Sequence, residues 1–347
     1  MATLGAFVRA FGNGVKVGGR YESRFMLFHW GLSVCSEKVR TVLSELDIGY
    51  SSQLVNILVG RQYDPKYVEL RLMAWRDMGC PPLVGDWRGG TSVRLNGFDP
   101  CVVPTLVDLE KNKVVVNSLD ICKYLFDLQE KTWSSEVIEK HLRFVDETPH
   151  KAFLFEPPAD SVDNRPLGIR KGTADGKALQ SYCDEVKRRL AERGTTWDDD
   201  DLERAYKAKL KSNEAGVQNS KKKDPNYYRD ALLTVRNHLE TLETDLNLTE
   251  GPYLTGPEIS IADLFHAVNF HRFYWVGQGP TIFDNTEPLL PRVRAYKDKL
   301  LRLKSLQDAV IFHPSMPPSE AMAPIKAILT AEKQQLQTAE SACCRIH

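Results

Sequence analysis

A serine and a cysteine stand two residues apart where an apolar run gives way to a helical pattern. Ser33 and Cys35 follow the run 25–28 and precede apolar residues at helical spacing. The free N–H groups and the dipole at the start of a helix lower the pKa of a thiol, which favours a reactive thiolate at Cys35. Cys35 also shares a helical face with Val39 and Leu43, as a core cysteine does. Both interpretations of Cys35 remain open at this point.

The elements around this pair have a recognisable order. Residues 25–56 read as strand, helix and strand, and residues 65–76 as a further helix. Two β-branched runs, 102–107 and 113–116, flank a polar turn and predict a β-hairpin. Ser118 is a natural N-cap for a following helix. The order β-α-β, hairpin, helix is that of a thioredoxin-like domain.

Strand signals almost vanish after residue 135, and helical periodicity dominates the rest. The predicted fold class is therefore α/β plus all-α, a thioredoxin-like N-terminal domain followed by an all-helical C-terminal domain. The boundaries predicted are a flexible arm at 1–24, the thioredoxin-like domain at 25–130, the helical domain at 135–315 and a tail at 316–347. A transit peptide is the other interpretation of the arm, although serine is scarce there. Residues 79–100, rich in glycine and proline, predict a surface insertion.

Two short motifs in the thioredoxin-like domain suggest a binding site. Val103-Pro104 heads a strand, where a cis proline would turn the main chain of Val103 outward to pair with a peptide-like ligand; an ordinary edge-strand proline is the alternative. Asn117-Ser118 begins a helix, where free N–H groups and a hydroxyl favour a carboxylate; a plain N-cap is the alternative.

A third motif lies in the helical region. Ser260 and Asp263 have the spacing of a capping box, with Asp in place of the usual Glu. Ile259 and Leu264 fall at the positions of a hydrophobic staple. We assign this motif a structural role, the start of a buried helix, and no part in catalysis.

In this order, the three motifs resemble those of the glutathione S-transferase family, over roughly residues 25–311. The segments "FHWGLSVCSEKVR", "GFDPCVVPTLVD" and "DETPHKAFLFEP" are similar to the glutathione-dependent reductive dechlorinases of chlorinated hydroquinones. Those enzymes carry a serine two residues before a cysteine, as Ser33 and Cys35 stand here, and an Asn-Ser pair. The resemblance implies a glutathione-transferase fold, glutathione as cosubstrate bound at Val103, Pro104 and the Asn-Ser pair, and pairing into a homodimer.

The resemblance also implies a mechanism that uses both catalytic residues. Ser33 would donate a hydrogen bond to the glutathione sulfur and so favour its thiolate. Glutathione would attack a dienone tautomer of the hydroquinone and displace halide. Cys35 would then attack the sulfur of the thioether, releasing reduced aromatic product, and a second glutathione would resolve the mixed disulfide.

The pocket for a small aromatic substrate is predicted between the two domains. His150 and Phe153 lie in the third dechlorinase-like segment, and Phe270 and Tyr274 lie on a later helix. Aromatic and imidazole groups can hold and deprotonate a phenol. Core packing is the alternative for each aromatic residue, and a structural histidine is the alternative for His150.

Composition excludes several classes of function. Lys plus Arg and Asp plus Glu both total 46, which argues against partners selected by bulk charge, such as nucleic acid or a membrane surface. No apolar stretch is long enough for a membrane span. Seven cysteines without C-x-x-C, and no Cys/His pairs at ligand spacing, indicate a reducing compartment such as the cytoplasm and no metal site.

The leading prediction is a glutathione-dependent transferase acting on an aromatic quinone or hydroquinone electrophile. The same machinery would serve a biosynthetic pathway for aromatic polyketides, a second candidate among enzymes. A non-catalytic member that only binds glutathione or acts as a scaffold is the alternative from another class. The joint presence of Ser33, Val103-Pro104 and Ser118 favours an enzyme.

Overall fold

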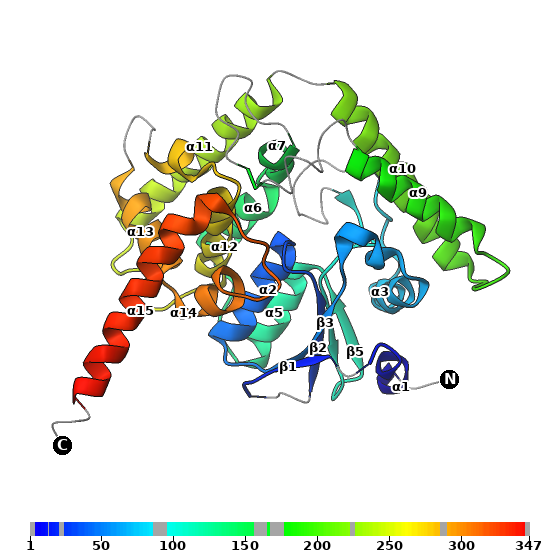
Figure 1. The fold of residues 1–347 in the computed structure, drawn as a ribbon, viewed down its shortest axis with the longest axis horizontal. Coiled ribbons are helices and arrows are strands. Elements are labelled where there is room, and N and C mark those ends of the chain that lie inside the picture. The colour runs from blue at the N-terminus through cyan, green and yellow to red at the C-terminus, as the bar shows by residue number, and fades with distance from the viewer. Residues whose placement is uncertain are drawn as a thin grey trace.

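A five-stranded mixed sheet forms the centre of the N-terminal domain in the computed structural model (Figure 1). Its order is β1-β3-β2-β4-β5; β2 and β3 run parallel and the other neighbours are antiparallel. The strands are β1 (Val15–Val17), β2 (Phe25–His29), β3 (Tyr50–Leu54), β4 (Thr105–Asp108) and β5 (Lys113–Val116). The residues described are 4–12, 14–20, 24–85, 96–155, 165–166, 177–222, 226–284 and 290–343.

Helices cover both faces of this sheet. Strand β2 alternates accordingly: Phe25 and Leu27 belong to one apolar cluster, and Met26 and Phe28 to the other. Helices α2 (Val34–Glu45) and α5 (Ser118–Leu128) pack together on the first face, and α3 (Pro65–Asp77) lies on the second with the short α1 (Leu4–Arg9) (Figure 1). The predicted thioredoxin-like domain, with its hairpin and final helix, is confirmed.

The C-terminal domain is helical throughout its described part, as predicted. Its centre is α12, which is buried along almost its whole length and packs against α2, α6 and α13. Ser260 and Asp263 form the capping box at its start: the Ser260 N–H donates to Asp263 Oδ2 over 2.7 Å, and the Asp263 N–H to Ser260 Oγ over 3.3 Å. The helices are α6 (Glu136–Glu147), α7 (His150–Phe155), α9 (Lys177–Ala191), α10 (Asp200–Lys222), α11 (Tyr227–Leu248), α12 (Ile261–Trp275), α13 (Pro291–Leu301), α14 (Lys304–Leu306) and α15 (Ala323–Cys343), with short turns η4 (Pro280–Asp284), η5 (Gln307–Ile311) and η6 (Glu320–Met322).

The two ends of the chain differ from expectation. In place of a flexible arm, the structure has α1, which buries Val8, and β1, which pairs with β3. The Phe11 ring packs edge-on against Phe28, with centroids 5.0 Å apart, so this arm adds to the apolar cover of the sheet. The tail contains α15, which extends away from the body of the molecule (Figure 1). Of the insertion at 79–100, residues 86–95 lie outside the described part, and an isolated bridge joins Leu83 to Phe98.

The helices α9 and α10 run side by side and pack on the thioredoxin-like domain, next to α3 (Figure 1). By sequence they fall within the predicted helical domain, but they pack on the second face of the sheet in the thioredoxin-like domain. Apolar side chains of α10 such as Leu202 and Tyr206 belong to the same cluster as Phe28 of β2. The two domains therefore do not divide at one point in the chain.

Candidate active site

Strand register brings the predicted motifs to one end of the sheet. Phe28 near the end of β2 pairs with Thr105 at the start of β4, and Thr105 pairs with Val116 at the end of β5. The chain leaves β2 toward Ser33, enters β4 from Pro104 and leaves β5 into α5. These three segments therefore meet at the same end of the sheet.

Ser33 is the N-cap of α2. Its hydroxyl accepts a hydrogen bond from the Ser36 N–H over 3.3 Å, which satisfies one of the free donors at the helix start. The interaction uses a lone pair and leaves the hydroxyl proton available for an anion. Ser33 and Cys35 are both half-buried, and Cys35, in the first turn of the helix, is not in a disulfide. A hydroxyl donor and a thiol thus share the positive end of α2.

A second thiol lies near Cys35, in surroundings that keep it protonated. Cys122 of α5 is fully buried. Burial, above all other causes, holds its pKa well above the usual range, and a thiolate at Cys35 would raise it further. Cys122 therefore stays protonated, while Cys35 is the thiol that reaches the helix start.

The peptide group of Val103 is open for a ligand. The Val103–Pro104 bond is cis, as predicted. The carbonyl groups on either side are occupied: Tyr67 Oη donates to Val102 O and Arg71 Nη1 to Pro104 O, each over 2.8 Å. The N–H and C=O of Val103 make no hydrogen bond with any described residue. An extended peptide-like ligand can pair with both.

The start of α5 is also open for a ligand, because no side chain of the described residues caps it. Asn117 precedes it with φ 67° and does not cap it; its side-chain amide donates to Asp120 Oδ2 over 3.2 Å instead. The first N–H groups of the helix and the Ser118 hydroxyl are thus available to an anion. At α2 and α6, by contrast, the N-cap serine side chain accepts from the helix.

The loop before Ser33 is held by a buried arginine and lies against residue 315. Arg40, fully buried on α2, donates to the carbonyls of Trp30 over 3.3 Å, Gly31 over 3.4 Å and Ala309 over 2.8 Å. Gly31 lies so close to residue 315 that a Cβ there would overlap the Ser315 carbonyl oxygen. This close approach requires glycine.

The helical domain reaches the same loop through Arg272 of α12. Its Nη2 donates to Leu32 O over 2.5 Å and to Glu37 Oε1 over 2.7 Å, and His271 Nδ1 lies 3.5 Å from Glu37 Oε2. Burial alone would raise the pKa of Glu37, but the charge of Arg272 and the contact with His271 outweigh it and lower that pKa. Glu37 is therefore ionised and ties α2 to α12.

The residues predicted for the substrate pocket differ in their burial and their contacts. Phe153 and Phe270 are fully buried and pack in the core, with the Phe270 and Phe283 ring centroids 5.1 Å apart, so they line no open site. Tyr274 is half-buried, stacks on Phe283 and accepts a hydrogen bond from Lys297 Nζ over 3.0 Å. For Phe153 and Phe270 the alternative of core packing describes the structure, because both rings are fully buried among other apolar side chains.

His150 is different, because it is buried without being satisfied. It is 6% exposed, and its Nε2 has no hydrogen-bond partner among the described residues. Burial first, then the charges of Lys38 and Arg272, lower the pKa of His150 well below its usual range. The imidazole is neutral and faces two cations of the domain interface.

Sequence reasoning missed the charged residues around His150. Lys38 is fully buried one turn beyond Cys35, and its Nζ lies 2.7 Å from Asp146 Oδ1 of α6. The signal for it was a lysine on the helical face that also carries Cys35. Among the described residues, no group of His, Cys, Asp and Glu side chains is arranged to hold a metal ion.

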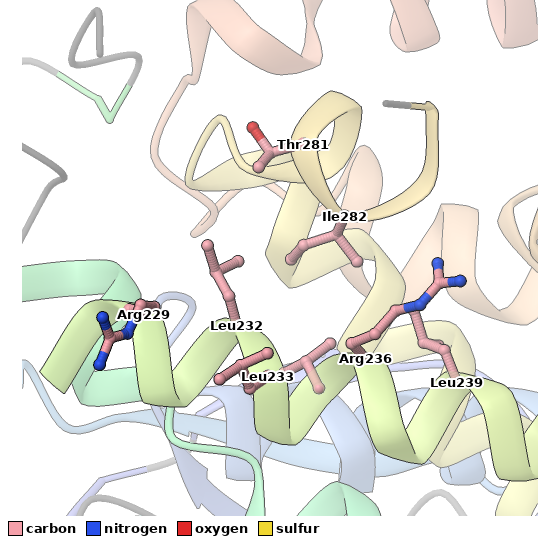
Figure 2. Close-up of a pocket in the computed structure, with 8 residues that line it drawn as sticks. Arg229, Leu232, Leu233, Arg236, Leu239, Thr281 and Ile282 are labelled. Carbon is pink, nitrogen blue, oxygen red and sulfur yellow. The ribbon is translucent and has the colours of Figure 1, made fainter. Parts of the chain in front are cut away.

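A hollow of about 300 Å³ lies elsewhere, between α11 and η4 (Figure 2). It contains none of the predicted site residues. Its lining is mostly aliphatic, with an arginine at either side: Arg229, Leu232, Leu233, Val235, Arg236, Leu239, Thr281 and Ile282. None of the helices in the described part of the chain has the length and apolarity needed to cross a bilayer.

A sheet with a cis proline at the head of β4, an open helix start after β5 and a capped all-helical partner domain are features of glutathione transferases. The chain is 35% identical over 307 residues to the 2,5-dichlorohydroquinone reductive dechlorinase of Sphingobium indicum, a member of that family, and the match covers 86% of each chain. The chain therefore belongs to the glutathione S-transferase family, as the motifs predicted, and is an enzyme of that family.

Two further comparisons agree with this family. Glutathione S-transferase TCHQD of Arabidopsis thaliana is 28% identical over 238 residues, which cover 69% of this chain and 73% of the plant protein. The β-etherase LigF of Sphingobium sp. strain SYK-6 shares the fold, with a TM-score of 0.50 at 13% identity, over 82% of this chain and 98% of LigF. No family model matches the chain.

Proposed function

We propose that this enzyme uses glutathione to remove a leaving group from a hydroquinone-type aromatic substrate. The observation that carries the proposal is the unpaired main-chain N–H and C=O of Val103, at the same end of the sheet as the open start of α5 and the Ser33 hydroxyl. The cysteine part of glutathione would pair with Val103, its γ-glutamyl carboxylate would bind at Ser118, and its sulfur would face Ser33. Family membership and the name of the Sphingobium relative support the choice of substrate class.

The first step of the proposed reaction forms a thioether. The glutathione thiolate, stabilised by the Ser33 hydroxyl and the dipole of α2, attacks the ring carbon that bears the leaving group in a dienone tautomer of the substrate. The carbon–sulfur bond forms, the leaving group departs with its electron pair as an anion, and loss of a ring proton restores the aromatic ring. The product of this step is a glutathionyl hydroquinone.

The second step reduces the ring. The Cys35 thiolate attacks the thioether sulfur, the carbon–sulfur bond breaks, and the ring carbon keeps the electron pair and takes a proton. A second glutathione thiolate attacks the mixed disulfide, releases glutathione disulfide and regenerates Cys35. Overall, the aromatic carbon is reduced, two glutathione thiols are oxidised to one disulfide, and the leaving group departs with one proton.

We propose that His150 and the nearby cations bind the phenolic oxygen of the substrate. The unpartnered Nε2 of His150 can accept or donate a hydrogen bond, and the charges of Lys38 and Arg272 favour a phenolate or the oxyanion of the dienone. A histidine held neutral by its surroundings is able to take the phenol proton. Phe153, Phe270 and Tyr274 then act only as the apolar support of this region.

A mass-spectrometric assay of Cys35→Ser tests the proposal. The variant, given glutathione and a panel of halogenated hydroquinones, should accumulate the thioether conjugate and form almost no reduced product. Wild type should form reduced product and glutathione disulfide in equal amounts. Cys80→Ser is the matched control, because Cys80 is exposed and distant in sequence from every motif of the site, and it should behave as wild type. Reduced product from Cys35→Ser at the wild-type rate would exclude the thiol-exchange step.

We further propose that the enzyme acts in the cytoplasm as a homodimer. Five cysteines of the described residues form no disulfide, which suits a reducing compartment rich in glutathione. Sedimentation of the purified protein at micromolar concentration tests the dimer; a single species at the 39.3 kDa mass of one chain would exclude it.

A further inference from the structure

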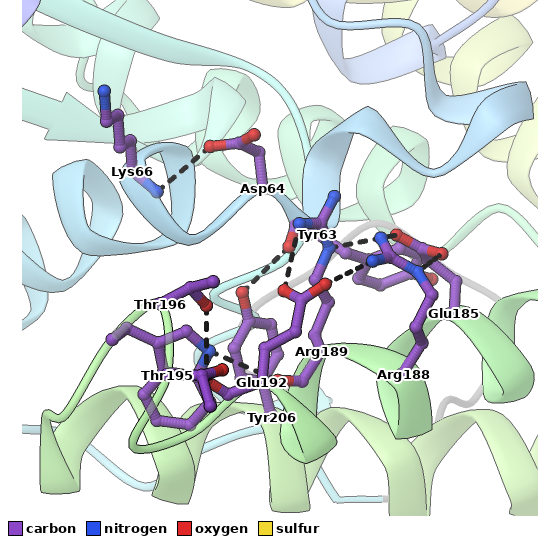
Figure 3. Close-up of polar contacts among 11 residues, drawn as sticks. Tyr63, Asp64, Lys66, Glu185, Arg188, Arg189, Glu192, Thr195, Thr196 and Tyr206 are labelled. Carbon is purple, nitrogen blue, oxygen red and sulfur yellow. Dashed lines mark hydrogen bonds and ion pairs between the residues drawn. The ribbon is translucent and has the colours of Figure 1, made fainter.

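The helical pair α9–α10 is attached to the glutathione-binding domain by buried polar contacts. Tyr206 Oη of α10 donates to the main-chain carbonyl of Tyr63 over 2.8 Å (Figure 3). Asn213 Nδ2, also on α10, lies 3.3 Å from Tyr63 Oη. Nearer the surface, Arg76 Nε of α3 lies 2.9 Å from Asp201 Oδ2. These contacts fix the position of α10 relative to α3.

One further contact leads from α10 to the segment before Pro104. Lys209 is 9% exposed, and its Nζ lies 2.5 Å from Asp99 Oδ2. The other carboxylate oxygen of Asp99 accepts from the Cys101 N–H over 2.9 Å, and its main-chain carbonyl accepts from Arg71 Nη2 over 2.9 Å. Asp99 therefore joins α10, α3 and the beginning of this segment.

Arg71 completes the connection. It is fully buried on α3, and its Nη1 donates to Pro104 O and to Thr105 Oγ1, each over 2.8 Å. No carboxylate of the described residues forms an ion pair with it; its N–H groups donate instead to main-chain and hydroxyl oxygens of the segment 99–105. Its guanidinium thus braces both ends of the segment that presents Val103.

We propose that Lys209 is a positioning residue for glutathione, acting through Asp99 and Arg71 on the open peptide group of Val103. This inference rests on the proposed glutathione site. Hydrogen bonds weaken steeply with misalignment, so a small displacement of Val103 weakens both bonds of its peptide group to the ligand. Partial loss of two such bonds corresponds to roughly a ten-fold rise in the Kd for glutathione.

This role predicts a change in glutathione affinity and little change in the other steps of the reaction. Lys209 touches neither Ser33 nor Cys35 in the structure, and it does not contact His150. Its loss should therefore raise the KM for glutathione, while the KM for the aromatic substrate and the kcat at saturating glutathione change much less. A residue that only stabilised the fold would lower the active fraction and leave both KM values unchanged.

The test compares Lys209→Met with Lys209→Arg and a matched lysine. Lys207→Met is the control, because Lys207 lies on the same helix, is 66% exposed and, among the described residues, pairs only with Glu203. Calorimetric titration with glutathione should show about ten-fold weaker binding for Lys209→Met, substantial recovery for Lys209→Arg and no change for Lys207→Met. Should Lys209→Met fail to fold, Asp99→Asn, which keeps the side-chain acceptor but removes the charge, replaces it with the same expectation.

The outcomes distinguish this inference from the proposed function. If wild type binds no glutathione, the proposed site is wrong. If wild type binds glutathione and Lys209→Met binds it equally well, the positioning role is wrong and the site stands. An equal rise in both KM values would also overturn the positioning role.

Discussion

Replacing Arg272 by leucine should destabilise the protein strongly, because it leaves a buried charge without its main partner. Arg272 is 3% exposed and Glu37 is fully buried, and the two are joined by a contact of 2.7 Å. Removing one member of a buried ion pair typically costs about 3–5 kcal/mol of unfolding free energy, since the remaining ion keeps its desolvation penalty. The variant also loses the hydrogen bond to Leu32 O, so the loop before Ser33 is released as well.

The pH dependence of this effect has a definite sign. In wild type the pKa of Glu37 is lowered: burial acts to raise it, but Arg272 and His271 together outweigh burial. The stability from the pair is therefore present above the unfolded pKa of Glu and is lost as the pH falls through the lower folded pKa. In Arg272→Leu burial dominates and raises that pKa, so the variant is most impaired at neutral pH. The difference from wild type should shrink as acid protonates Glu37.

Urea unfolding of both proteins at neutral and mildly acidic pH measures this. The matched control is Arg302→Leu, because Arg302 pairs with Glu332 over 3.0 Å at the surface, where both side chains are 40% or more exposed. Such a pair contributes about 0–1 kcal/mol. A double variant, Glu37→Leu with Arg272→Leu, should recover part of the lost stability. If Arg272→Leu costs no more than Arg302→Leu, or if its deficit grows in acid, the reasoning is refuted.

Three other predictions concern the site and its histidines. Ser33→Ala should raise the pKa of the bound glutathione thiol by about one to two units, the worth of one hydrogen bond to a charged group, and thiolate absorbance against pH would show it; an unchanged titration excludes Ser33 as the activator. His150→Phe should raise the KM for the aromatic substrate and leave calorimetric glutathione binding unchanged. If variant and wild type have the same KM for the aromatic substrate, His150 does not bind it. Burial, then the Arg40 charge, lowers the pKa of His313 to about 4, so unfolding free energy should fall as the pH drops from about 6.5 to 4. His313→Gln should flatten that slope, and a slope that stays the same would show that other groups cause it.

Local patterns were enough to predict the strands and the caps. The β-branched runs around residues 102–107 and 113–116 gave the hairpin because alternation with buried faces is a local property of a strand. Ser260 and Asp263 indicated the start of α12 because a capping box involves only neighbouring residues. The sequence predicts that Ser33, Val103-Pro104 and Asn117-Ser118 lie close together only through the thioredoxin-like order of the elements. That order makes β2, β4 and β5 neighbours in the sheet.

The supporting residues could not be predicted in this way. Arg71 bonds to Pro104, which lies 33 residues away in the sequence, and Lys209 bonds to Asp99, which lies 110 residues away. No spacing rule connects positions so far apart. Strand β1 has three residues, too few to show alternation, and it exists because β3 offers an unpaired edge. For Phe153 and Phe270, the same helical pattern suits a pocket and a core, and only packing decides.

The position of these supports explains why the reactive residues depend on both domains. The segment Trp30–Leu32, which sets the start of α2, receives hydrogen bonds from Arg40 on its own helix and from Arg272 on α12. A helix dipole acts within about one turn, so the roles proposed for Ser33 and Cys35 depend on α2 beginning where it does. Separation of the domains would remove the hydrogen bond from Arg272 to Leu32 O and release the start of α2. The chemistry proposed for the sheet domain thus requires the helical domain to be docked, even before an aromatic substrate binds.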